Sequence, residues 1–155
     1  MMGIKKKIII FLLVLLNSCG FSSIYNNVEN DNLKLNIISA VGDKDLNNQI
    51  SNYAKLYSNL NSENEYQVTI NSYYDKEVIA KNASGVATDY RVIANVNFIV
   101  KFNGKDENIN FQESIKMVNN TDIFEQNNYE KNLKKNFASS IVKKLIIKIL
   151  RTNDN

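Results

Sequence analysis

The chain has 155 residues, of which 19 are lysine or arginine and 16 are aspartate or glutamate, and it contains no histidine, tryptophan or proline. The lack of histidine removes the commonest general base and metal ligand at neutral pH. The single cysteine excludes an intramolecular disulfide, and the five glycines are scattered and form no phosphate-binding loop. Composition therefore argues against an enzyme, and we expect no catalytic residues, no metal and no cofactor.

A basic and then apolar segment lies near the start of the sequence. Three lysines at 5–7 precede nine apolar residues at 8–16, the order found in export signals. Nine residues are too few to cross the roughly 30 Å hydrocarbon core of a membrane as a helix. The stretch 16–19 (Leu-Asn-Ser-Cys) is similar to a bacterial lipobox, which implies removal of residues 1–18 and acylation of Cys19. An uncleaved signal anchor with an incidental cysteine is the alternative.

This leader also explains the charge of the chain. Its three lysines supply the whole formal charge of +3, so residues 19–155 are neutral and give no nucleic-acid signal. Residues 19–32 are mostly polar and are expected to form a lipidated tether. The remaining 33–151 have room for a single domain with one core.

The domain is expected to begin with a strand and a helix. Residues 33–37 alternate apolar and polar side chains, which predicts a strand that ends at Gly42. Apolar residues then recur at helical spacing from Leu46 to Leu60, which predicts a helix of about 17 residues with Asp43 or Asp45 as its N-cap.

Alternation returns after this helix. Residues 66–79 are rich in β-branched and aromatic side chains, which predicts a second strand, and 83–85 predict a turn. The clearest pattern covers 90–117, where Asn103-Gly104 interrupts two alternating segments. This pair favours a two-residue type I′ turn, because both residues tolerate positive φ.

The turn fixes which residues of the hairpin face one another. It pairs residues whose numbers sum to 207, and this register keeps apolar side chains on one face. The resulting pairs are Phe98 with Ile109, Val96 with Phe111, Val92 with Ile115, and Arg91 with Lys116. Two pairs break the pattern, namely Val100 with Glu107 and Ala94 with Glu113.

The last segment predicts a second amphipathic helix over about 126–151. Its apolar stripe follows an i+4 spacing and consists of Tyr129, Leu133, Phe137, Ile141, Leu145 and Ile149, widened by Ala138, Val142 and Ile146.

These elements predict an α+β fold in the order β-α-β-β-β-α. Each strand has one apolar and one polar face, as in a sheet that is covered on one side only. We expect a two-layer sandwich, in which two helices pack on one face of a four-stranded, mainly antiparallel sheet. The other face would be rich in asparagine, and is either solvated or a polar contact surface for another protein.

Two groups of cations are candidate binding features. Seven positive residues lie in 131–151 with no acid between them, which suits anionic lipid or phosphorylated saccharide, or else a solvated helix face. Arg91 and Lys116 are directly opposed in the predicted register. Because opposed like charges repel, an anionic partner there would be favourable.

The order of elements and the lipobox together point to a known family. Ser18-Cys19-Gly20-Phe21 with Ile24-Tyr25 resembles the opening of the LPS-assembly lipoprotein (LptE) family, especially its alphaproteobacterial branch. Residues 87–91 (Ala-Thr-Asp-Tyr-Arg) resemble the start of that family's third strand, and the terminal helix with Tyr129 and Phe137 is similar as well.

The resemblance implies a lipid-anchored, periplasm-facing outer-membrane protein of a Gram-negative bacterium, with acyl chains and diacylglycerol on Cys19. Gly20 after that cysteine is compatible with outer-membrane sorting. It further implies a plug of the LPS-assembly β-barrel (LptD), which supports assembly of the barrel and insertion of lipopolysaccharide. From the register, we expect Arg91 and Lys116 to contact lipopolysaccharide.

Two other functions stay open at this point. A lipid-binding accessory lipoprotein of another envelope lipid-transport system would need an apolar cavity between helices and sheet. An envelope hydrolase would need a carboxylate pair in a pocket, and the sequence offers no candidate.

Overall fold

The computed structural model describes residues 33–153, so the leader, Cys19 and the tether at 19–32 lie outside the described residues. The described elements follow the expected order, β-α-β-β-β-α. They are β1 (Lys34–Gly42), α2 (Lys44–Leu56), β2 (Glu65–Lys81), β3 (Ala87–Phe102), β4 (Lys105–Val118) and α3 (Ile123–Asn153).

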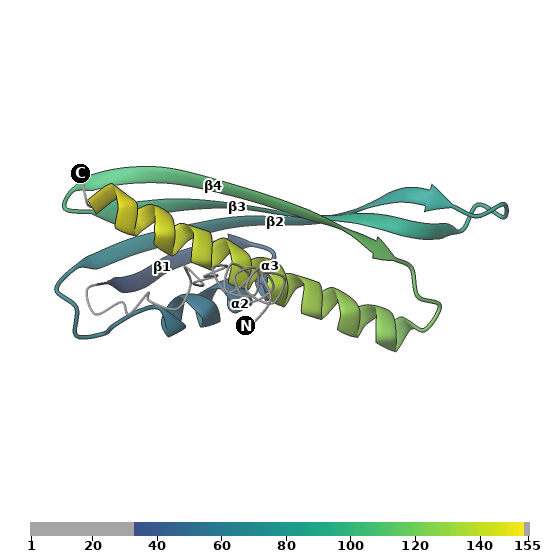
Figure 1. Ribbon diagram of the computed structural model, residues 1–155, viewed down its shortest axis with the longest axis horizontal. Helices are drawn as coiled ribbons and strands as arrows, with labels where there is room; N and C mark the ends of the chain where they lie inside the picture. The colour runs from purple at the N-terminus through teal and green to yellow at the C-terminus, as the bar shows by residue number, and fades with distance from the viewer. Residues whose placement is uncertain (1–32, 154–155) are drawn as a thin grey trace, which may run out of the picture.

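One mixed sheet and two helices form the two layers. The strand order is β1-β2-β3-β4, with β1 parallel to β2 and the other neighbours antiparallel. The parallel pair follows from α2, because a helical crossover returns the chain to the same end of the sheet. Both helices lie below the sheet in Figure 1, and α3 runs along most of its length. The predicted α+β fold is confirmed.

The hairpin of β3 and β4 has the predicted register. Every pair from Asp89 with Val118 to Phe102 with Lys105 sums to 207. Asn103 and Gly104 have φ angles of 50° and 76°, the left-handed values that a type I′ turn requires. Alternate residues of β3 therefore face the helices, and those between them face away.

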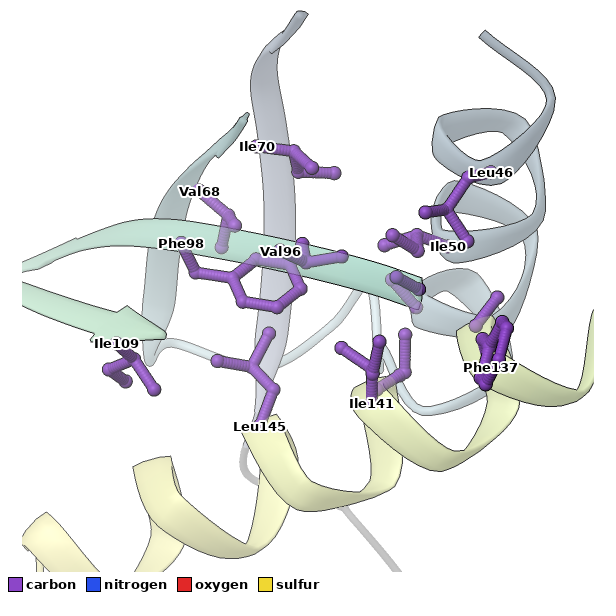
Figure 2. Close-up of a cluster of buried hydrophobic side chains, with 14 of the residues drawn as sticks. Leu46, Ile50, Val68, Ile70, Val96, Phe98, Ile109, Phe137, Ile141 and Leu145 are labelled. Atoms are coloured by element: carbon purple, nitrogen blue, oxygen red, sulfur yellow. The ribbon is translucent and has the colours of Figure 1, made fainter. Parts of the chain in front are cut away.

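The core fills the space between the layers. Phe98 and Val96 of β3 point down onto Ile141 and Leu145 of α3, while Leu46 and Ile50 approach from α2 (Figure 2). All eight residues of the predicted α3 stripe from Leu133 to Ile149 are buried. Tyr129 was expected to belong to this stripe, but its side chain is 43% exposed.

The helix boundaries differ from the prediction. The side chain of Asp43 accepts a 2.7 Å hydrogen bond from the Leu46 N–H and caps α2 as expected. However, α2 ends at Leu56, and the 79% exposed Leu60 lies outside the helix. The helix ends because Tyr57 N–H bonds back to Ala54 O instead of continuing the α-helical pattern. At α3, Asp122 accepts from two N–H groups, so this helix starts three residues earlier than expected.

β1 extends beyond residues 33–37, the part of the sequence in which apolar and polar side chains alternate. It continues to Gly42, but Ile38 has no partner, because Ile37 pairs with Val68 and Ser39 with the next residue of β2. This bulge interrupts the alternation of side chains, but β1 ends at Gly42 as predicted. Gly42 closes the strand at φ 108°, and a Cβ there would stand 1.8 Å from the Ser72 carbonyl oxygen.

Candidate functional site

The sheet surface that faces away from the helices, called the outer face below, is the candidate contact surface. Its centre consists of two rows of directly paired residues, one of asparagines only and one of a tyrosine with two amides. These are Asn71–Asn97–Asn110 and Tyr73–Asn95–Gln112. Asn110 Nδ2 donates to Asn95 Oδ1 at 2.8 Å. Because each amide both donates and accepts, this surface can bond to polar groups of either kind without adding charge.

The outer face is charged towards the end of the sheet that leads to the β2–β3 turn. There Arg91 and Lys116 lie opposite one another as predicted. Each cation has a carboxylate partner. Lys116 Nζ lies 2.9 Å from Asp89 Oδ1, and Arg91 Nη1 lies 3.7 Å from Glu77 Oε2. The sequence analysis missed both carboxylates, although Asp89 lies diagonally across the predicted register from Lys116. Two cations and two anions balance here, and the assignment of Arg91 and Lys116 to lipopolysaccharide stays a prediction.

Hydrogen bonding holds the carboxylates of Asp89 and Glu65 in the charged form. The bond from Lys116, aided by one from Thr88, lowers the pKa of Asp89 below its ordinary value. At the opposite end of the sheet, bonds from Lys34 and Asn36 lower the pKa of Glu65 in the same way. The outer face thus has a neutral centre between ends where opposite charges are paired.

The β2–β3 hairpin projects beyond the rest of the sheet as an arm, defined as residues 78–88 (Figure 1). β1 stops at the pair Gly42–Ser72, and β4 stops at Val118, so none of the strands within residues 33–153 flanks the arm. Its turn has the predicted Gly85 at φ 80°. Val78, Ile79 and Val86 are exposed on the arm. Sequence analysis did not foresee it, since alternation says nothing about how far neighbouring strands extend.

The basic run of α3 is partly neutralised by the sheet. Lys144 Nζ and Ser140 Oγ both lie 2.6 Å from Glu113 Oε1, and Lys148 Nζ lies 3.5 Å from Glu107 Oε1. These are the two carboxylates that broke the apolar pattern of the hairpin. They face α3, so a helix lysine compensates each one.

A third lysine of α3 is held against α2. Lys134 is 13% exposed, lies 2.9 Å from Asp43 Oδ2, and stacks 4.4 Å above the centre of the Tyr74 ring. Burial, with the nearby Glu130 and Asp43 carboxylates, raises the pKa of the Tyr74 hydroxyl above its ordinary value. This cluster ties the start of α2 to α3 and borders a polar pocket of about 390 Å³.

The described residues contain open pockets at their surface. One of them has a volume of about 640 Å³ and lies between β1 and α2. Within residues 33–153, no group of three or more histidine, cysteine, aspartate or glutamate side chains is placed to hold a metal ion. None of the helices described has the length and apolar character that crossing a membrane requires.

The described residues thus define a two-layer α+β domain with a polar, amide-rich outer face. This fold is shared with the rare lipoprotein B of Shewanella oneidensis, at a TM-score of 0.58 and 14% identity over 79% of this chain and 99% of that one. It is also shared with a minor lipoprotein of Acinetobacter baumannii, at a TM-score of 0.55 and 13% identity over 79% and 92%. The sequence matches no protein-family profile and no curated protein sequence. The likeness is therefore one of fold.

Proposed function

We propose that this chain is an outer-membrane lipoprotein, acylated at Cys19 and facing the periplasm, that binds and plugs the LPS-assembly barrel LptD. In this role it supports assembly of the barrel and insertion of lipopolysaccharide. The observation that carries the proposal is the shared fold, which covers 99% of a solved lipoprotein. In this chain the same fold follows a lipobox-like stretch at 16–19.

The outer face suits a polar barrel interior. The lumen of an outer-membrane barrel is lined by polar side chains. The amide rows offer donors and acceptors across three strands without net charge, so they can pair with such a lining at little electrostatic cost. The arm extends this surface and adds the exposed apolar side chains of Val78, Ile79 and Val86 to it.

Lipopolysaccharide would meet the charged end of the outer face. A phosphate group could take the place of Asp89 beside Lys116 and of Glu77 beside Arg91, since charge-assisted bonds to phosphate have similar geometry. The carboxylates would keep the two cations in position until the phosphate arrives. This mode requires displacement of existing partners, so we expect it to be weak and reversible.

The alternative, a lipid-binding accessory lipoprotein, requires an apolar cavity between sheet and helices. The side chains of the core occupy that space (Figure 2), and the hollow of about 270 Å³ at its end, beside Tyr66, Phe102 and Ile149, is open to solvent. The 640 Å³ pocket lies at the edge of the sheet and is open to solvent; it is lined by Leu35, Ile37, Ala54 and Leu60 together with Asn36, Ser51, Lys55 and Ser58. We therefore prefer the barrel-binding function.

A pull-down tests the proposal. The acylated chain with a C-terminal tag should recover an LPS-assembly barrel from detergent-solubilised envelope, and recovery as a lone monomer would refute it. Asn97→Arg in the middle of the outer face should reduce recovery of the barrel. Asn128→Arg on the exposed side of α3 introduces the same charge and should leave recovery unchanged.

A further inference from the structure

The positive charge of the described chain is concentrated in α3. This helix has seven lysine and arginine residues and two glutamates, whereas the rest of the described chain has nine cations and eleven carboxylates. Three of the seven cations form ion pairs with carboxylates outside α3. The pairs are Lys134 with Asp43, Lys144 with Glu113, and Lys148 with Glu107. The other four make no ion pair within residues 33–153. We call them the α3 ridge: Lys131, Lys135, Lys143 and Arg151.

The ridge residues lie on the exposed surface of α3, and they are distributed around the helix because they do not follow the 3.6-residue repeat. All four residues are exposed and none belongs to the buried stripe from Leu133 to Ile149. At a rise of 1.5 Å per residue, the ridge from 131 to 151 is about 30 Å long. The two glutamates of α3 precede it, and Glu130 is already bound to Lys76 at 2.9 Å. The exposed surface of α3 therefore carries four uncompensated cations along this length.

A hollow lies in the middle of the ridge. It has a volume of about 350 Å³ and is lined by Asn136, Ser139, Ser140, Lys143, Lys144 and Ile147. Ser140 and Lys144 are engaged by Glu113, which leaves the Lys143 ammonium, the Ser139 hydroxyl and the Asn136 amide as donors. Three donors around one hollow match the acceptor oxygens of a phosphodiester.

We propose that the α3 ridge docks on the anionic phospholipid surface of the membrane that holds the lipid anchor, with a headgroup phosphate in this hollow. This step rests on the proposed anchor at Cys19. The tether at 19–32 spans at most about 3.5 Å per residue, roughly 50 Å in all, so α3 is within reach of the headgroups. Basic residues there are attracted to anionic lipid. Docking is a state of the anchored chain without its barrel, and it leaves the outer face free.

The test uses the acylated full chain in vesicles. Acylation occupies the sulfur of Cys19, so an introduced cysteine is the free thiol. Asn132→Cys on the ridge should react several-fold more slowly with a water-soluble maleimide in vesicles of phosphatidylcholine plus phosphatidylglycerol than in phosphatidylcholine alone. Asn108→Cys on the outer face should react equally in both. High salt should remove the protection, since it screens exposed charge. Equal rates for Asn132→Cys in the two vesicles would overturn the proposal.

Charge-matched variants distinguish docking through the ridge from attraction of the protein to the vesicle through its net charge. Replacement of all four ridge residues by glutamine should abolish the protection. Replacement of Lys44, Lys55, Lys81 and Lys105 by glutamine makes the same change in net charge at exposed lysines elsewhere, and should preserve it. Equal loss in both variants would refute docking by the ridge.

The same vesicles test the anchor separately. Flotation with phosphatidylcholine alone reports acylation, and its absence would count against the proposed function. If the chain proves to be unanchored, the ridge can still be tested. The unanchored chain should then float with phosphatidylglycerol vesicles at low salt but not at high salt, and the variant with glutamine at Lys131, Lys135, Lys143 and Arg151 should not float.

Discussion

Lys144 of α3 and Glu113 of β4 are joined by a 2.6 Å contact on the side of the sheet that faces the helices. The carboxylate is 17% exposed and the lysine 50% exposed, so the two partners differ in what they lose when separated. If the lysine is removed, a nearly buried charge loses its partner. If the carboxylate is neutralised, the lysine can return to water.

This asymmetry predicts different costs for the two single substitutions. Lys144→Gln should lower the free energy of unfolding by about 1 kcal/mol, because it leaves Glu113 with Ser140 as its one remaining side-chain partner. Glu113→Gln should cost less, and the double variant should match it. Urea unfolding measures all three. Lys143→Gln, one residue away on the exposed ridge, is the control and should change stability by less than about 0.5 kcal/mol. A larger loss for Glu113→Gln than for Lys144→Gln would contradict this prediction.

Two glycines with positive φ should respond unequally to alanine. Gly85 has open space around it, so Gly85→Ala should cost about 1 kcal/mol, the penalty of the left-handed backbone alone. Gly42→Ala must also move the Ser72 carbonyl oxygen, which is backbone, and should cost more than about 3 kcal/mol or prevent folding. Thermal unfolding compares the two. Similar melting temperatures would show that the end of β1 can shift to make room.

The Lys116–Asp89 pair should make stability depend on pH in acid. The folded-state pKa of Asp89 lies below its ordinary value of 3.8, so this carboxylate stabilises the fold above that pH and loses its effect as pH falls through the folded-state pKa. Lys116→Gln should raise the pKa of Asp89 and reduce stability relative to wild type above pH 3.8. The difference should shrink in stronger acid. NMR titration of the carboxyl carbon measures the pKa directly.

Lys101→Gln is the control for this titration. Lys101 is an exposed lysine on the outer face that lies 3.9 Å from Asp106 and makes no ion pair with Asp89 among the described residues. It should leave the Asp89 titration unchanged. If Lys101→Gln and Lys116→Gln shifted the pKa of Asp89 equally, the effect would be one of net charge and not of the hydrogen bond.

Cys19→Ser should separate anchoring from folding. Residue 19 precedes the described domain, so circular dichroism and the unfolding midpoint should not change. Stable membrane attachment should be lost, since permanent anchoring requires more than one acyl chain. Fractionation of the envelope after an alkaline wash measures attachment, with Ser22→Ala as the control. A wild-type protein whose mass shows an unmodified Cys19 would contradict the prediction.

Local patterns in the sequence were enough for the hairpin and for the buried side of α3. Asn103-Gly104 fixes the turn, and a one-residue slip from there would mix apolar and polar side chains on both faces, so the register has a single solution. The i+4 spacing from Leu133 to Ile149 similarly has one interpretation. Both depend on neighbours that are close in sequence or related by a tight turn.

The features that were missed depend on contacts between distant segments. Glu107 and Glu113 look like errors within the hairpin, and only the position of α3 above them explains why they are tolerated. The end of α2 at Leu56 and the bulge at Ile38 reflect how β1 and α2 meet the rest of the domain. The carboxylate partners of Arg91 and Lys116 could be found in part, since the position of Asp89 followed from the register.

The uneven division of charge between the layers gives this domain an electric dipole moment that points from the sheet towards α3. Near any negatively charged boundary, such a dipole experiences a torque before contact is made. The domain would therefore turn its helical side to the boundary and present its asparagine rows to the opposite compartment. A protein with the same net charge spread evenly would arrive in every orientation.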